Sequence, residues 1–176
     1  AVGFGGCQDS ILSGVPLIVD HLKIQPPAKT QDYDTLASSQ EFAEAFAYWF
    51  GRGAAAERYV SDETLWKSIV AGARATESAR WLLGGNALLM GDRIAKEGGD
   101  VLLGSRIAPE MRDRVHPRVK LVNTTDDDVD IHVLLEFQEG SQWGDFSAPR
   151  ANRLALHRDQ YNPQMESLEQ LSAEIV

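Results

Sequence analysis

The chain has 176 residues, of which 43% are hydrophobic, enough to bury the core of one domain or part of a larger one. Its 17 basic and 26 acidic residues give a formal net charge of −9, which argues against a nucleic-acid groove held by phosphate contacts. No run reaches the ~20 apolar residues of a membrane span. The single cysteine, Cys7, excludes an internal disulfide and fits the cytoplasm and the endoplasmic reticulum lumen equally.

Both ends of the sequence look like internal parts of a longer protein. The chain begins inside a predicted strand, residues 1–4, and stops at the end of a predicted amphipathic helix, residues 165–176. We therefore expect this sequence to be part of a longer chain.

The first predicted strand, residues 1–4, runs into two glycines, Cys7 and Asp9. A strand that ends in glycines and a carboxylate can deliver an acid to the edge of a sheet, where ligands of open α/β folds bind. Asp9 is therefore a candidate ligand acceptor. The alternative is that Asp9 only caps a helix that begins near Ile11. Residues 25–38 are polar and are predicted to form a loop.

A helix is predicted over residues 39–50, where Phe42, Phe46 and Trp49 form an aromatic stripe that favours the core over a base-stacking surface. Glu57 follows a glycine turn in a stretch of small residues. It is a candidate to bind a ligand hydroxyl, or it pairs with a neighbouring arginine on the surface. Residues 61–64 read as a capping box for a helix that continues to residue 75.

Residues 81–96 predict a strand, a tight turn at Gly84-Gly85 and a helix with one apolar face. The start of a helix presents backbone N–H groups and a positive dipole end, and glycines let a ligand approach the main chain. This turn is therefore a candidate binding site. The alternative is a turn that merely needs small residues. The glycines do not complete a dinucleotide-binding fingerprint.

Further along the chain, strands are predicted at residues 100–103 and 119–122, with a short helix at 109–115 between them. This order indicates crossover connections and a buried parallel sheet. The acidic run 124–128 is predicted to be a solvated turn, because its spacing matches no calcium loop. Residues 130–138 and 151–156 predict paired strands that suit a sheet covering a ligand cleft. His132 has no nucleophile near it in the sequence, which gives little support to a catalytic role.

Four segments in this order resemble the family of ADP-dependent glucokinases, and the animal-type enzymes look closer than the archaeal ones. The segments are Ser13-Gly14-Val15 after Asp9; Gly53-Ala54-Ala55-Ala56-Glu57-Arg58; Leu83-Gly84-Gly85-Asn86-Ala87; and residues 130–140 with Trp143-Gly144 and residues 148–153.

The resemblance implies an α/β fold, a ribokinase-like three-layer αβα sheet domain with a smaller β-rich lid that would include strands at about 130–137 and 151–156. It implies transfer of the β-phosphoryl group of ADP to the 6-hydroxyl of D-glucose with Mg2+, giving glucose 6-phosphate and AMP. The family's sugar-binding roles carry to Asp9, Glu57, Gly84 and Gly85, with Asn86 adjacent. Carboxylates and backbone N–H groups suit sugar hydroxyls, which donate and accept hydrogen bonds.

Two departures from the family pattern bear on the choice of sugar. Animal-type relatives have Asn-Ala-Cys where this chain has Gly5-Gly6-Cys7, so an amide that contacts the sugar is missing. Where relatives can carry a histidine, this chain has Arg150, which is a candidate to bind a phosphorylated or more acidic ligand.

The family's nucleotide pocket, magnesium-binding acidic motif and catalytic aspartate are expected beyond residue 176, because no GxGD-like turn occurs in this sequence. The chain is thus expected to be the N-terminal, sugar-binding portion of a kinase. Without the C-terminal portion of the same enzyme it should not catalyse phosphoryl transfer, which depends on positioning and charge neutralisation. The alternative is a non-catalytic sugar-binding or regulatory module derived from this family.

Overall fold

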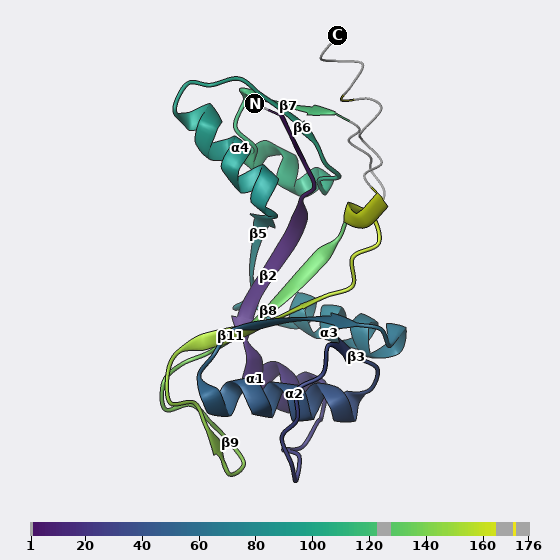
Figure 1. Ribbon diagram of the computed structural model, residues 1–176, viewed down its shortest axis with the longest axis vertical. Helices are drawn as coiled ribbons and strands as arrows, with labels where there is room; N and C mark the ends of the chain where they lie inside the picture. Colours follow the sequence, from purple (N-terminus) through teal and green to yellow (C-terminus); the bar gives the residue numbers. More distant parts are fainter. Residues whose placement is uncertain (1, 123–127, 165–170, 172–176) are drawn as a thin grey trace. The chain divides into compact units, whose positions relative to one another are not determined.

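The computed structural model describes residues 2–122, 128–164 and 171 (Figure 1). The chain forms two compact units. The first contains Ala1–Asp9, Trp81–Ile131 and Asp159–Val176, and the second contains Ser10–Arg80 and His132–Arg158.

A parallel three-stranded sheet forms the centre of the first unit, in the order β1 (Val2–Phe4), β6 (Val101–Gly104) and β7 (Val119–Val122). Helix α4 (Asn86–Lys96) contacts all three strands and follows β5 (Arg80–Gly84), which lies next to β2 (Cys7–Ser13). Leu88, Leu103 and Met111, the last on the 3₁₀ helix η2 (Pro109–Arg114), are buried in one cluster. The predicted parallel sheet is confirmed.

The second unit is built on a six-stranded mixed sheet in the order β3 (Thr35–Leu36), β4 (Ala56–Val60), β11 (Asn152–His157), β8 (Ile131–Phe137), β2 and β5. Strand β4 runs parallel to β3 and β11, whereas β11 runs antiparallel to β8. The predicted pairing of residues 130–138 with 151–156 is therefore confirmed. The loop between these two strands contains a hairpin, β9 (Gln142–Trp143) and β10 (Phe146–Ser147).

Helix α2 (Ser39–Arg52) supplies the aromatic core of the second unit, as its stripe predicted. Phe42, Phe46 and Phe50 are fully buried, and the ring of Phe46 meets Phe137 and Trp143 edge to face. The helix α3 (Glu63–Ala75) was also predicted. Its N-cap Asp62 accepts a hydrogen bond from the Leu65 N–H at 2.9 Å.

The first predicted strand ends at Phe4 as expected, but the alternative that Asp9 caps a helix beginning near Ile11 is wrong. After Gly5-Gly6 the chain resumes as β2, so Asp9 lies in the middle of a strand and caps no helix. The following residues form a single turn, α1 (Gly14–Pro16), and a π-helix, η1 (Leu17–His21). Strands β3 and β4 were not predicted either.

The apolar face predicted for α4 is only partly buried. Leu88 and Ala95 are buried, whereas Leu89 and Met90 are 52% and 64% exposed. Two other predictions, the acidic turn at 124–128 and the helix at 165–176, lie outside the described residues except at Asp128 and Leu171. Within the described ranges, no helix has the length and apolar character needed to cross a membrane.

Asp32 anchors the loop before α2 to strand β4. Its carboxylate accepts hydrogen bonds from both sides of the Arg58 guanidinium and from Trp49 Nε1 at 2.9 Å. Of the separate effects on the pKa of Asp32, burial is the largest, and by itself it raises that pKa. The hydrogen bonds from Arg58 and Trp49, with the charge of Arg58, outweigh it and bring that pKa below its ordinary value.

We expect Asp32→Asn to lower the free energy of unfolding by about 1–3 kcal/mol at pH 7, because Arg58 and Trp49 lose a charged acceptor. The folded protein binds the Asp32 proton more weakly than the unfolded chain does. The contribution is therefore complete above the unfolded pKa and is lost as the pH falls through the folded pKa, below about pH 4. Urea unfolding at pH 7 and pH 3 measures this, with Asp34→Asn in the same exposed loop as the control. An equal loss at both pH values would contradict the assignment.

Candidate functional site

Three of the predicted site residues come together in the first unit. Asp9 projects from β2 against Gly84 at the end of β5, so closely that a Cβ on Gly84 would lie 2.2 Å from Asp9 Oδ1 and 2.6 Å from Oδ2. Only a glycine leaves room for the carboxylate in this position. The sequence placed Asp9 and Gly84 75 residues apart, and the neighbouring strands β2 and β5 bring them into contact.

Gly85 is the N-cap of α4 and has a φ of 89°, a left-handed conformation that L side chains rarely adopt. A Cβ there would also lie 2.8 Å from Gly6 Cα. Asn86 is the first residue of α4 and is exposed. The first intrahelical bond runs from the Leu89 N–H to the Gly85 carbonyl at 3.1 Å, so the preceding N–H groups have no acceptor within the helix.

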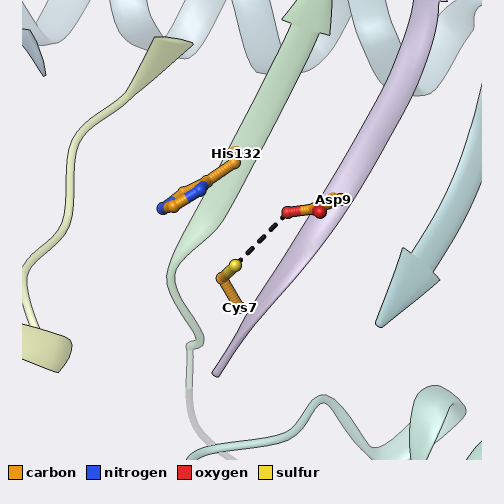
Figure 2. Close-up of side chains that lie close together, drawn as sticks. All are labelled: Cys7, Asp9 and His132. Atoms are coloured by element: carbon orange, nitrogen blue, oxygen red, sulfur yellow. Dashed lines mark hydrogen bonds between the residues drawn. The ribbon is translucent and has the colours of Figure 1, made fainter. Parts of the chain in front are cut away.

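The Cys7 thiol donates a hydrogen bond to Asp9 Oδ1, with 3.3 Å between sulfur and oxygen (Figure 2). Burial, followed by the negative charge of Asp9, strongly raises the pKa of Cys7. The thiol therefore stays protonated at neutral pH and acts as a donor rather than as a nucleophile. It fixes one oxygen of the Asp9 carboxylate.

Asp130 holds residues 160–162, which lie beside Gly6. Asp130 was not identified from the sequence as a site residue. Its side chain is buried and accepts hydrogen bonds from the backbone N–H groups of Gln160, Tyr161 and Asn162, at 2.7 to 3.3 Å. Asn162 Oδ1 in turn accepts from the Gly6 N–H at 3.2 Å. Residues about 30 positions apart make these contacts, so no local sequence pattern points to them.

In the second unit, Glu57 lies on β4 with its side chain 58% exposed. The sequence left open an ion pair between Glu57 and a neighbouring arginine. The guanidinium of Arg58 forms its ion pair with Asp32 instead. Instead, Glu57 Oε1 lies 4.0 Å from His157 Nε2 on β11.

Arg150 is exposed and lies against the C-terminal end of α2, where a Cβ on Gly53 would be 2.9 Å from Arg150 N. The neighbouring Asn152 side chain donates to the Gly53 carbonyl at 3.1 Å. These contacts fix the backbone of residues 150–152 against the turn that precedes β4. Glu57 and Arg150 thus belong to the second unit, and Asp9, Gly84, Gly85 and Asn86 belong to the first.

The residues of the first unit offer a carboxylate acceptor and helix-start N–H donors at one turn. That combination suits a neutral ligand with hydroxyl groups, because each hydroxyl can donate to the carboxylate and accept from an N–H group. Every described cluster of three or more side-chain ligands includes a histidine, whereas magnesium prefers oxygen ligands alone.

Comparisons with known proteins agree on one family. The family model "ADP-specific Phosphofructokinase/Glucokinase conserved region" matches residues 1–176. The chain is 35% identical to the ADP-dependent glucokinase of Bos taurus and 37% identical to the probable ADP-dependent glucokinase of Caenorhabditis elegans, each over 171 residues. Both alignments cover 96% of this chain but 34% of the relative, so the chain spans about a third of these relatives' length.

Solved structures show the same fold at low sequence identity. A hypothetical ADP-dependent phosphofructokinase from Pyrococcus horikoshii OT3 matches 99% of this chain with a TM-score of 0.66 and 14% identity, over 46% of its own length. A phosphofructokinase from Pyrococcus horikoshii OT3 with AMP matches 98% of this chain with a TM-score of 0.62 and 13% identity, over 44% of its own length. The predicted ribokinase-like α/β fold is therefore confirmed.

Proposed function

Because the chain belongs to the ADP-specific phosphofructokinase and glucokinase family, we propose that it is the sugar-binding portion of an ADP-dependent glucokinase. The observation that carries this proposal is the contact between the Asp9 carboxylate and the Gly84-Gly85 turn at the start of α4. These are residues for which the family resemblance implies binding of glucose hydroxyls. Glu57 is the second carboxylate in the proposal, and Asn86 and Arg150 are further contacts.

The proposed reaction of the full-length enzyme is transfer of the β-phosphoryl group of ADP to the 6-hydroxyl of D-glucose, which gives glucose 6-phosphate and AMP. Magnesium would neutralise the phosphate charge in that reaction. In this proposal, the described part of the chain contributes the sugar-binding residues. Asp9 and Glu57 accept hydrogen bonds from sugar hydroxyl groups and so orient the sugar. The glycines of the turn allow the sugar to approach the main chain closely.

We expect Asp9→Ala to weaken glucose binding by about tenfold, because a sugar hydroxyl loses a charged acceptor. Calorimetric titration of the 176-residue chain with glucose measures the affinity. Asp145→Ala, an exposed aspartate in the second unit, is the control and should bind glucose as the unchanged chain does. Equal affinities of Asp9→Ala and the control would overturn the assignment of Asp9.

A second candidate function is a non-catalytic sugar-binding or regulatory module derived from the family. The observation that favours it is the exposed surface of Leu89 and Met90 on α4, the helix that begins at the Gly84-Gly85 turn. Such a module should bind glucose tightly unaided, whereas a portion of a kinase should bind it weakly. Incubation of the chain with Mg-ADP and glucose is a further test. Robust formation of glucose 6-phosphate would contradict both candidates, since each expects this chain alone to be inactive.

A further inference from the structure

The second unit contains a cavity of about 530 Å³, and none of the proposed sugar contacts lines it. One wall is a face of helix α3, from Thr64 to Ala75. The other wall is formed by His21 at the end of the π-helix η1 and by Leu22 and Ile24 after it. Sites for small molecules typically have volumes of about 300–1,000 Å³. The cavity therefore has the size of a ligand site, and the proposed function gives it no role.

The backbone beside the cavity is unusual at two points. Leu17–His21 form a π-helix, a rare conformation that occurs frequently at functional sites. Lys23 lies between the lining residues Leu22 and Ile24 and has a φ of 56°, which is uncommon for a residue with a side chain. Such a conformation persists only where the surrounding structure holds it, and it is found most often at ligand-binding and switch regions. The Ile24 N–H helps to hold it by donating to the Ile18 carbonyl at 3.0 Å.

Part of the cavity lining is apolar. Leu65 of α3 is buried, and Leu22 and Ile24 on the opposite wall are half-buried. Gly72 lets the π-helix pack closely on α3, because a Cβ at this position would lie 2.6 Å from Leu17 Cδ1. An apolar lining of this kind suits the body of a small molecule, whose orientation is then fixed by a few polar groups.

The polar groups of the lining offer acceptors for hydrogen bonds. Asp62 caps α3 with Oδ1, which accepts from the Leu65 N–H at 2.9 Å, and no described donor bonds to its Oδ2. The Ser68 hydroxyl donates to the Thr64 carbonyl at 2.9 Å, so the lone pairs of Ser68 Oγ remain as acceptors. Among the described residues that line the cavity there is no lysine or arginine, so Asp62 gives the lining a negative charge at neutral pH.

We propose that this cavity binds a small organic amine, with the ammonium group at Asp62 and the apolar body against Leu22, Ile24 and Leu65. An ammonium group donates hydrogen bonds and carries the charge opposite to that of the carboxylate, so it complements the acceptors of the lining. A phosphate or carboxylate ligand would be repelled by Asp62. The inference does not rest on the proposed sugar binding, because the cavity and the proposed sugar contacts share no residue.

The probe is 2-phenylethylamine, and 2-phenylethanol is its neutral counterpart of nearly the same shape. NMR titration of the isotope-labelled chain should show the amine shifting the backbone N–H signals of Leu22, Ser68 and Gly72, with a Kd of about 1 mM or lower. The alcohol should bind at least about tenfold more weakly, because it has no charge for Asp62 to attract. The proposal is overturned if the amine shifts none of these signals at about 10 mM, or if the alcohol binds equally well.

Asp62→Asn tests the charge without removing the helix cap, because asparagine caps a helix about as well as aspartate does. It should weaken binding of the amine by about tenfold and leave binding of the alcohol unchanged. Asp34→Asn, at an exposed position of the same unit outside the cavity, is the matched control and should bind the amine as the unchanged chain does. Equal affinities of Asp62→Asn and the control for the amine would refute the role of Asp62.

Ser68→Leu tests the location of the amine independently of charge. Ser68 is exposed on α3, so a leucine there can extend into the cavity without disturbing the core of the unit. Binding of both probes should then fall by about tenfold or more, because the added side chain takes up their space. Unchanged binding of the amine by Ser68→Leu would show that it binds elsewhere and would contradict the proposal.

Discussion

Gly85→Ala is expected to destabilise the protein by about 3 kcal/mol or more, for two physical reasons that act at the same residue. The φ of 89° places any L side chain in a strained conformation, which costs about 1–2 kcal/mol. The new Cβ would also lie 2.8 Å from Gly6 Cα, and a backbone atom cannot move aside as a side chain can. Overlap of this kind costs about 1–3 kcal/mol. Urea unfolding followed by circular dichroism measures the loss.

Gly98→Ala separates the cost of the strained backbone conformation from the cost of the overlap with Gly6. Gly98 has nearly the same φ, 91°, but no described atom lies within 4 Å of the position its Cβ would take. We therefore expect Gly98→Ala to cost only the conformational part, about 1–2 kcal/mol. The difference between the variants measures how closely Gly85 and Gly6 approach. If Gly98→Ala were as destabilising as Gly85→Ala, the close packing of the turn on Gly6 would have no energetic weight.

The regular elements could be predicted where the apolar period is strong. Helix α2 shows this best, because its aromatic residues recur at helical spacing and its cap Ser38 accepts a hydrogen bond from the Glu41 N–H. Strands β5 and β6 are short apolar runs bounded by glycines or charges, which the sequence also makes plain. Local sequence alone determines these elements.

Strands β2 and β4 could not be predicted, because their sequences are poor in strand-forming residues. In β2, Gln8, Asp9 and Ser10 are typical of turns and helix caps, and pairing within the sheet overrides that preference. Strand β4 contains Ala56 and Glu57 and is held by parallel pairing with β11, about 100 residues later in the chain. Pairing over such a separation leaves no local signal.

The residues of the candidate site could be predicted only where a local sequence pattern marks them. The sequence singled out Asp9 and the two glycines, since a carboxylate and a glycine pair after strands are local patterns. It gave no sign that Gly84 is needed to make room for the Asp9 carboxylate. It also missed Asp130, whose role depends on backbone groups about 30 residues away.

Gly84→Ala is expected to weaken glucose binding by about 100-fold, a larger effect than that of Asp9→Ala. The added methyl group would lie 2.2 Å from Asp9 Oδ1, so the carboxylate must rotate away from the turn. Rotation breaks its hydrogen bond with the Cys7 thiol and removes the acceptor from the sugar. The methyl group also narrows the turn that the sugar must approach. Glucose titration by calorimetry measures the affinity, and Gly51→Ala, where no described atom lies within 4 Å, is the control.

The double variant Asp9→Ala with Gly84→Ala shows whether the glycine acts through the carboxylate. If it does, the methyl group has no carboxylate left to displace once Asp9 is alanine, and Gly84→Ala should then cost only the part due to the narrowed turn, about tenfold. The summed losses of binding free energy in the two single variants should then exceed the loss in the double variant, with a coupling energy of about 1–3 kcal/mol. The stability lost in Gly84→Ala should also be recovered in the double variant, because the overlap is relieved. Additive losses of affinity would show that Asp9 and Gly84 bind the sugar independently and would refute the proposed role of the glycine.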